Sequence, residues 1–337
     1  MKAAVVESPG APIAIAEVGE RTPGRGEVAI DVAACGICHT DGDIAAGQYA
    51  GTRFPLVPGH EIAGTISAVG PGVDWPTVGT RVGLPWLYSS CGRCRACLHG
   101  DGILCRSSKI TGLTEPGGYQ ERMLADPRFL VELPDELDPI EAAPLMCAGF
   151  TAFTGLRRGG MRPGDRVAVT GFGGLGEMGV AYARAMGGRV AVVSGSPDKE
   201  RSARAAGAEL FVDARDDVTA ALLAWDGGAD LILHTAPAPQ LAADALRGLD
   251  DDGVLVVLGV GEGSLSFTPH DVIERRRRVI GVPSGSPKEL RDALRFAAQQ
   301  GIRPSVTPFA LDDVAEAVQR AHALPGRAVL TMSAASR

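Results

Sequence analysis

The 337-residue sequence has few aromatic residues, no excess of positive charge and no long apolar run. Its formal net charge is -7, which argues against a nucleic-acid-binding protein, because that class needs a basic surface to neutralise phosphates. No apolar segment approaches the roughly 18 residues that would span a membrane as a helix. The opening residues, MKAAVVESPG, lack the apolar core and cleavage site of a secretory signal. We therefore expect a cytoplasmic protein without nucleic-acid or membrane partners.

Cysteine and glycine are the informative residue types. The chain has seven cysteines, and in a reducing cytosol these favour metal ligands or nucleophiles over disulfides. Four of them lie in CGRCRACLHGDGILC, two in CGICHTDGD and one in APLMCAG. Glycine makes up 45 of the 337 residues, well above the usual share of about 7%, which predicts many tight turns and close backbone approaches.

Hydrophobic patterning divides the chain into two styles. In the first part, short runs such as EVAIDVAA and EIAGTISAVG are rich in β-branched residues and predict β-strands. From about residue 165, apolar runs such as DRVAVT and ADLILH alternate with helical segments, which predicts βαβ units and a doubly wound parallel sheet. The predicted fold is α/β: a β-rich domain at residues 1–144 and 283–337, interrupted by a Rossmann domain at residues 145–282.

The segment GFGGLG at 171–176 lies directly after a predicted strand and before a predicted helix, the context in which G-x-G-x-x-G binds a dinucleotide. Gly171 permits a tight turn, Gly173 lets the backbone approach the pyrophosphate, and Gly176 allows the helix to pack against the strand. The helix N-terminus then attracts the pyrophosphate through its free amide groups and its dipole. The predicted cofactor contacts of this loop are Gly171, Gly173, Gly174, Leu175 and Gly176.

The next predicted strand ends without the acidic residue that NAD enzymes use to bind the ribose hydroxyls. An acid there would repel a 2′-phosphate, whereas Ser194, Ser196, Lys199 and Arg201 could bind one. Asp198 is nearby, but the Ser-Pro-Asp triplet that it ends is typical of a helix start. We therefore predict a preference for NADP(H), with NAD(H) use and a merely solvated Lys199 and Arg201 as the alternative.

Cys91, Cys94, Cys97 and Cys105 share one loop with the spacing C-x2-C-x2-C-x7-C. Four thiolates suit tetrahedral Zn²⁺, and a site closed by four cysteines is structural, because no position remains for a substrate. An iron–sulfur cluster also uses four cysteines, but nothing else in the sequence indicates electron transfer. The loop therefore predicts a structural zinc site.

Cys38, His60 and Cys147 lie far apart in the sequence, and Glu61 follows the histidine. Two cysteines, one histidine and an open fourth position form one known type of catalytic zinc site. Spacing alone does not assemble these three residues. Taken singly, each is more often a buried cysteine or a histidine with its hydrogen bonds satisfied.

Six motifs occur in order along essentially the whole chain: GICHTD at 36–41, GHEIAG at 59–64, LPWLYSSCGRCRACLHG at 84–100, GGYQERMLADP at 117–127, APLMCAGFTAF at 143–153 and GFGGLG at 171–176. Together they resemble the zinc-dependent medium-chain alcohol dehydrogenases, near the bacterial, yeast-like and cinnamyl-alcohol branches. The resemblance implies that the β-rich part is a GroES-like catalytic domain. It also implies a zinc-dependent alcohol dehydrogenase or aldehyde reductase that transfers a hydride between a nicotinamide cofactor and an alcohol or carbonyl substrate.

Carried over by position, the family pattern implies roles for individual residues. Cys38, His60 and Cys147 would hold the catalytic zinc, and the four-cysteine loop would hold the structural zinc, so each chain would bind two ions. Glu61 would lie behind the catalytic metal and enter its coordination shell transiently. Asp41 would orient His60, as metal-bound histidines usually require.

Further positions would contact the cofactor and the substrate. His39 would contact the cofactor pyrophosphate, and Thr40 would hold the substrate oxygen and shuttle its proton. In many relatives the proton continues to a histidine three residues later, where this chain has Asp43. Three alternatives follow: Asp43 carries the proton itself, water replaces the histidine, or the reaction needs no such relay. Tyr49 and Trp86 lie where aromatic side chains often line the substrate site, with core packing as an equal alternative.

Two other functions stay open. Asp43 in the relay position would suit an enzyme that reduces an activated C=C or iminium bond on the same fold. The alternative from another class is a zinc- or redox-sensing binding protein without turnover, against which the complete set of zinc ligands argues. The strand near VIGVPSG resembles the element with which relatives pair their subunits, so a homodimer is expected, with a tetramer as the alternative.

Three polar features are expected to be structural. The arginine run in ERRRRVIG at 274–281 is interpreted as a solvated helix end, because it is isolated in an acidic protein. Asp250–Asp252 is interpreted as a loop, and His234 as a structural residue at the end of a strand.

Overall fold

The chain forms two compact units in the computed structural model, which describes residues 1–321 and 323–332. The first unit contains Met1–Cys147, Ser286–Gln299 and the chain from Arg303 onward, and the second contains Ala148–Gly285 and Gln300–Ile302. The boundaries expected from the sequence, after residues 144 and 282, lie three residues before these transitions.

A seven-stranded sheet is the centre of the first unit. Its strands are β3 (Val28–Gly36), β4 (Glu61–Val69), β5 (Arg81–Leu84), β8 (Arg122–Ala125), β9 (Val131–Glu132), β16 (Val306–Ala310) and β17 (Arg327–Thr331). They follow the order β16-β17-β3-β4-β5-β9, and β8 is a further partner of β3. Aliphatic side chains such as Ile30, Ile62 and Val82 are fully buried in the core of this unit, which explains why these runs form strands.

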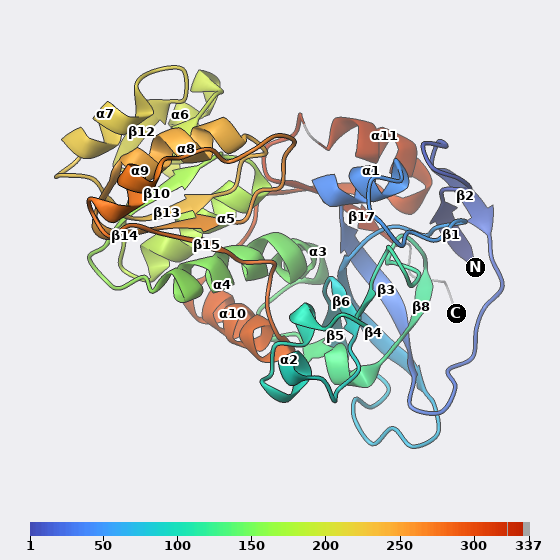
Figure 1. The fold of residues 1–337 in the computed structure, drawn as a ribbon. Coiled ribbons are helices and arrows are strands. Elements are labelled where there is room, and N and C mark those ends of the chain that lie inside the picture. The colour runs from blue at the N-terminus through green and yellow to red at the C-terminus, as the bar shows by residue number, and fades with distance from the viewer. Residues whose placement is uncertain (322, 333–337) are drawn as a thin grey trace. The chain divides into compact units, whose positions relative to one another are not determined.

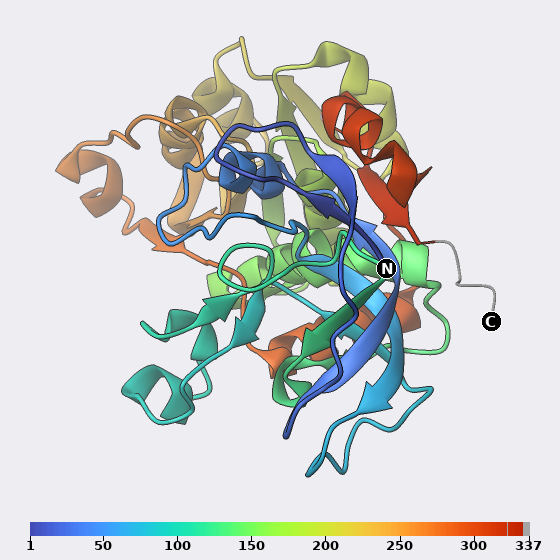
Figure 2. The ribbon, with the colours of Figure 1, turned by 90° about the vertical axis from the view of Figure 1, so that its right-hand side faces the viewer.

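The long strand β3 has neighbours on both edges. It runs antiparallel to β4 along its whole length, and Figure 2 shows the two strands side by side. On its other edge, the first half pairs with β8 and the last three residues pair with β17. This pairing places Val329, in the middle of β17, beside Gly36, which lies two residues before Cys38.

Short elements complete the first unit. The two-stranded sheets are β1 (Lys2–Val5) with β2 (Ala14–Glu17) and β6 (Leu87–Ser89) with β7 (Lys109–Ile110), and the helices are α1 (His39–Ala45), α2 (Arg95–Leu98), α3 (Pro139–Pro144), α10 (Pro287–Gln300) and α11 (Val314–Arg320). The strands predicted in the first part of the chain all form. No helix in residues 1–321 and 323–332 is long and apolar enough to cross a membrane.

The second unit contains a six-stranded parallel sheet with helices on both faces (Figure 1). Its elements are α4 (Phe150–Gly159), β10 (Arg166–Thr170), α5 (Gly174–Ala185), β11 (Arg189–Ser194), α6 (Glu200–Ala205), β12 (Leu210–Asp213), α7 (Val218–Ala224), β13 (Ala229–His234), α8 (Pro239–Arg247), β14 (Leu249–Val257), α9 (Pro269–Ile273) and β15 (Arg278–Gly281). The strand order is β12-β11-β10-β13-β14-β15. This confirms the predicted α/β fold with a doubly wound sheet, whose order reverses between β10 and β13.

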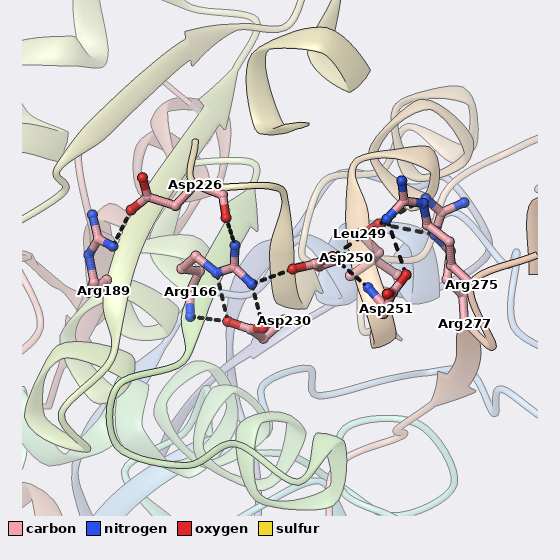
Figure 3. A network of polar contacts seen from close by, with 9 residues as sticks. All are labelled: Arg166, Arg189, Asp226, Asp230, Leu249, Asp250, Asp251, Arg275 and Arg277. Atoms are coloured by element: carbon pink, nitrogen blue, oxygen red, sulfur yellow. Dashed lines mark hydrogen bonds and ion pairs between the residues drawn. The ribbon is translucent and has the colours of Figure 1, made fainter. Parts of the chain in front are cut away.

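An ion-pair network connects several strands of this sheet (Figure 3). The guanidinium of Arg166, at the start of β10, lies 2.8 Å from carboxylate oxygens of both Asp230 on β13 and Asp250 on β14. The interpretation of residues 250–252 as a loop is therefore wrong, because they belong to β14. Aspartate is unfavourable in strands, but here the register of β14 against β13 is irregular and arginines compensate the charges.

The arginine run after α9 is only partly solvated, because Arg276 and Arg278 are exposed whereas Arg275 and Arg277 are partly buried. Arg275 pairs with Asp251 at 3.1 Å, and Arg276 pairs with Asp252 at 2.6 Å. The half-buried Arg277 donates hydrogen bonds to backbone carbonyls, including that of Leu249 at 2.8 Å (Figure 3). These arginines therefore stabilise the turn into β15, in agreement with a structural role.

Candidate active site

Four of the predicted site residues meet in the first unit. Cys38 is the N-cap of α1, His60 directly precedes β4, Glu61 begins β4, and Cys147 follows α3. Each offers one possible ligand atom, and these atoms all lie within 4.8 Å of one another. The fold thus assembles a cluster that sequence spacing could not define.

Cys147 lies in a single π-helical turn, Leu145–Gly149, between α3 and α4. The turn follows Pro144, which has no backbone N–H and cannot continue the hydrogen-bond pattern of α3. Such widened turns are rare in helices and frequently occur at functional sites. The local sequence therefore explains why the helix is interrupted at the cysteine.

Asp41 connects two residues of the cluster. One of its carboxylate oxygens, Oδ1, lies 2.8 Å from Nδ1 of His60, and the other accepts a hydrogen bond of 2.9 Å from the backbone N–H of Cys38. A carboxylate at Nδ1 keeps the proton on that nitrogen and leaves Nε2 as the free ligand atom. Burial opposes protonation of His60, but Asp41 outweighs it and raises the pKa of the imidazole. The predicted partnership of Asp41 and His60 is present in the structure.

Glu61 is fully buried, and neither of its carboxylate oxygens has a hydrogen-bond partner among the described residues. Burial raises the pKa of Glu61 to about 8, against the opposing effect of Arg327. A buried carboxylate without hydrogen bonds is costly, and a nearby cation would relieve that cost. Arg327 supplies one such cation at 3.2 Å, and the two oxygens without hydrogen bonds leave capacity for a metal ion beside Glu61.

The donor set of the cluster fits zinc. Two thiols, one imidazole and one carboxylate are ligands that Zn²⁺ accepts, and soft thiolates discriminate against Mg²⁺ and Ca²⁺. A hydrogen bond from Cys147 lowers the pKa of Cys38 well below its usual value, so one thiolate of the pair is already favoured. With Nε2 of His60 free, Cys38, His60 and Cys147 could hold a zinc ion with Glu61 as a further carboxylate.

The four cysteines of the second predicted site also converge. The ligand atoms of Cys91, Cys94, Cys97 and Cys105 lie within 4.8 Å of one another. The Sγ atom of Cys97 lies 3.9 Å from that of Cys91 and 3.5 Å from that of Cys94. Sulfurs around a tetrahedral zinc ion are separated by about 3.8 Å, given a Zn–S bond of about 2.3 Å. Backbone N–H groups of Arg93 and Cys94 lower the pKa of Cys91 to about 6, which favours the thiolate.

The glycine-rich loop joins β10 to α5, as predicted. Gly171 has φ +95°, a conformation that other residues rarely adopt, and Gly173 is the N-cap of α5. A Cβ atom on Gly176 would lie 2.0 Å from the carbonyl oxygen of Gly171, so only glycine allows the helix to approach the turn. A Cβ atom on Gly173 would meet nothing within 4 Å, which leaves open space next to the helix N-terminus. This geometry suits a bound pyrophosphate.

Comparison with known proteins identifies the family of the chain. A model of the alcohol dehydrogenase GroES-like domain matches residues 24–135, and a model of the zinc-binding dehydrogenase family matches residues 174–299. An alcohol dehydrogenase from Geobacillus stearothermophilus is 37% identical over 98% of this chain and 99% of its own length. The chain belongs to the zinc-dependent medium-chain alcohol dehydrogenase family. The enzyme is therefore an oxidoreductase of the alcohol dehydrogenase type, with zinc and a nicotinamide cofactor.

Solved structures of the family have the same fold. The structure of a cinnamyl alcohol dehydrogenase from Sorghum bicolor has a TM-score of 0.91 and 29% identity, and covers 98% of this chain and 97% of its own. A structure described as CAD from Helicobacter pylori, complexed with NADP(H), has a TM-score of 0.89 and 28% identity, with the same two coverages. These neighbours confirm the GroES-like and Rossmann folds predicted for this dehydrogenase.

Aromatic side chains lie beside the cluster of Cys38, His60, Glu61 and Cys147 in this dehydrogenase. The ring centroid of Trp86 is 5.0 Å from that of His60 and 6.2 Å from that of Tyr49, both in edge-on geometry. Tyr49 also forms a side-chain hydrogen bond with Thr40. Both aromatic residues are only partly buried, where they pack against a small apolar cluster around Ile44 and Leu56. The structure thus places Tyr49 next to the predicted proton carrier Thr40, and Trp86 next to His60.

The predicted relay residue Asp43 lies on α1, one turn after His39. Its Oδ1 atom is 3.7 Å from Nε2 of His39, and the Asp43 side chain is partly exposed. The structure therefore pairs the predicted relay residue with the predicted pyrophosphate contact. Both residues lie on α1, whose N-cap is Cys38.

The predicted ribose-binding residues follow β11. Ser194 ends this strand and is buried, and its Oγ accepts a hydrogen bond of 3.2 Å from the backbone N–H of Ser196. Lys199 is half-buried and donates a hydrogen bond of 3.0 Å to the carbonyl of Phe172 in the glycine-rich loop. Arg201 is exposed on α6. Lys199 therefore places its positive charge at the glycine-rich loop, and Arg201 remains at the surface.

Two residues of the site were not predicted. Arg327, at the start of β17, forms an ion pair of 3.2 Å with Glu61, and Tyr119 donates a hydrogen bond of 2.9 Å to Oδ2 of Asp41. Tyr119 lies inside one of the family motifs, but no spacing rule connects it to Asp41. Arg327 reaches Glu61 only because β17 pairs with β3, which is a long-range pairing that the sequence does not specify.

Proposed function

We propose that this enzyme is an NADP(H)-preferring alcohol dehydrogenase or aldehyde reductase with one catalytic and one structural zinc ion per chain. The observation that carries the proposal is the convergence of Cys38, His60, Glu61 and Cys147 within 4.8 Å. When bound, zinc would supply Lewis-acid catalysis and the nicotinamide would supply the hydride.

The residues of the chain would bind, orient and move a proton. Cys38, Cys147 and Nε2 of His60 would hold the catalytic ion, and Glu61 would remain behind it as an exchangeable carboxylate. The hydroxyl of Thr40 would hydrogen-bond to the substrate oxygen, and the side chains of Tyr49 and Trp86 would line the substrate site. Cys91, Cys94, Cys97 and Cys105 would hold the structural ion.

Metal analysis of cysteine variants tests the two zinc sites. We expect two zinc ions per purified chain. The Cys147→Ser variant should hold one zinc ion and have no activity, and the Cys94→Ser variant should also hold one zinc ion. Cys35→Ser is the matched control, because Cys35 is buried near the cluster but belongs to neither ligand set. If the unchanged chain held a single zinc ion that only Cys94→Ser removed, the binding-protein alternative would replace the enzyme.

Asp43 would continue the proton relay from Thr40. Replacing it with Asn keeps the size of the side chain but removes its capacity to accept a proton. We expect kcat to fall and its pH profile to change, with KM for the cofactor less affected. An unchanged profile would show that water carries the proton instead.

The preference for NADP(H) is supported by the absence of an acid at the end of β11 and by the positive charge of Lys199 near the glycine-rich loop. His39 would add a further contact to the pyrophosphate. Steady-state kinetics with both reduced cofactors and one aldehyde test the preference. A higher kcat/KM with NADH would reverse it.

Reduction of an activated C=C or iminium bond is the second candidate, and the acid at position 43 favours it. An α,β-unsaturated aldehyde separates the two reactions, because carbonyl reduction gives the unsaturated alcohol and C=C reduction gives the saturated aldehyde. A panel of primary, secondary and aromatic alcohols with both cofactors would then define the substrate class and the preferred direction.

We also infer a cytoplasmic homodimer. β15 is an edge strand of the six-stranded sheet, and an edge with free backbone groups can pair with a second copy. Light scattering of the purified enzyme tests this assembly, and a mass of four chains would favour the tetramer.

A further inference from the structure

Asp41 is the carboxylate that joins two of the proposed zinc ligands. Its Oδ1 atom binds the imidazole of His60 and its Oδ2 atom binds the backbone N–H of Cys38. Asp41 itself is 4% exposed, so water contributes little to its orientation. The direction of both ligands therefore depends on what fixes this carboxylate.

Tyr119 supplies the remaining contact. Its hydroxyl donates a hydrogen bond of 2.9 Å to Oδ2 of Asp41, and its side chain is fully buried. Burial, reinforced by Asp41, raises the pKa of Tyr119 well above its usual value, so the hydroxyl keeps the proton that it donates. Oδ2 thus receives two donors, which prevents the carboxylate from rotating away from His60.

Tyr119 is itself held at several points. Its backbone N–H donates to the carbonyl of Pro58 at 3.0 Å, and its carbonyl accepts from the N–H of Ala4 at 2.8 Å. Its ring lies against Gly59, the residue before His60, where a Cβ atom would be 2.3 Å from the ring. Tyr119 therefore contacts the His60 segment through its ring and backbone, and Asp41 through its hydroxyl.

We propose that Tyr119 is a positioning residue of the catalytic zinc site, acting through Asp41 on His60 and Cys38. This inference rests on the proposed function, because it presumes that these residues hold zinc. Groups that orient metal ligands typically change metal affinity or activity by about 10–100-fold when they are replaced. The hydroxyl of Tyr119 increases the zinc affinity indirectly, because it keeps His60 and Cys38 in place before the ion binds.

Zinc release in the absence of substrate and cofactor tests the inference. Tyr119→Phe removes the hydroxyl and retains the ring against Gly59. A colorimetric chelator should remove one zinc ion about 10–100-fold faster from this variant than from the unchanged enzyme. The zinc ion of the four-cysteine loop is an internal reference, and its release rate should not change.

Tyr88→Phe is the matched control. It also loses one hydroxyl in the same unit, where Tyr88 donates a hydrogen bond of 3.3 Å to the carbonyl of Leu124. We expect both zinc ions to leave Tyr88→Phe at the unchanged rate. A merely structural role of Tyr119 would lower the melting temperature of Tyr119→Phe without selectively accelerating the release of either zinc ion.

The outcomes separate this inference from the proposed function. Release of both ions from Tyr119→Phe at the unchanged rates would overturn the role of Tyr119 and leave the zinc site intact. If the Cys147→Ser variant held as much zinc as the unchanged enzyme, the proposed catalytic zinc site would be refuted, and the role of Tyr119 with it.

Discussion

Single residues determine what each site can hold. Position 176 requires glycine, because a Cβ atom there would lie 2.0 Å from the backbone carbonyl oxygen of Gly171. Glycine at position 173 faces open space instead, so its role concerns the ligand and not the fold. Similarly, Cys35 and Cys38 form an apparent C-x-x-C pair, yet only Cys38 belongs to the metal-ligand cluster.

Alanine substitutions distinguish the two glycines. Gly176→Ala should destabilise the second unit, by about 1–3 kcal/mol for a methyl group forced against backbone. Gly173→Ala should fold like the unchanged enzyme but bind NADPH more weakly, because its methyl group occupies the pyrophosphate position. Thermal melting and fluorescence titration with NADPH measure the two effects. Equal melting temperatures for the two variants would contradict the expected steric difference.

At the scale of elements, ion pairs hold strands that propensity alone would not form. β14 begins with three aspartates, and Arg166 and Arg275 contact the first two of them (Figure 3). Arg166 also contacts Asp230 and therefore connects β10, β13 and β14. The sequence suggested a loop here because aspartate is rare in strands, and the compensating arginines lie far away in the chain.

Replacing Arg166 with methionine tests this network. Loss of the cation leaves Asp230 and Asp250 without their shared partner, which should cost about 1–3 kcal/mol. Amide exchange in β13 and β14 should then accelerate by about 5- to 100-fold in mass-spectrometric measurements. Arg204→Met removes an exposed pair with Glu200 on α6, worth about 0.3–0.5 kcal/mol, and a hydrogen bond to the carbonyl of Glu209, and it should leave β13 and β14 unchanged.

The same ion-pair network predicts how the folding stability depends on pH. The hydrogen bond from Arg166 lowers the pKa of Asp250 below its usual 3.8. For Asp230 burial acts in the opposite direction, but Arg166 outweighs it and the pKa is also lowered. Because the folded pKa values lie below the unfolded ones, the stabilisation is complete above pH 3.8 and is lost as the pH falls through the folded values. Acid unfolding should therefore show a smaller stability difference between Arg166→Met and the unchanged enzyme than unfolding at neutral pH.

At the scale of the molecule, the two units carry different chemistry. The first unit contains both clusters of metal-ligating side chains, and the second contains the glycine-rich loop and Lys199. Each ligand should therefore stabilise its own unit.

Hydrogen exchange with and without ligands tests this division. NADPH at about 100 times its Kd should stabilise the second unit by about 2.7 kcal/mol and slow exchange in β10 and α5. Removal of zinc by a strong chelator should accelerate exchange in α2 and in β6 and β7, which flank the four-cysteine loop. If NADPH alone slowed amide exchange in the four-cysteine loop, the expectation that each ligand stabilises its own unit would be contradicted.

The sequence by itself determined the features that depend on local spacing. The four-cysteine loop, the glycine-rich turn and the alternation of strands and helices all lie within short segments, so local geometry decides them. Family motifs extended this to Cys38, His60 and Cys147. The tertiary structure alone decided which distant groups surround these ligands. Tyr119 reaches Asp41 and Arg327 reaches Glu61 through long-range strand and loop pairing, and no periodicity in the sequence encodes such contacts.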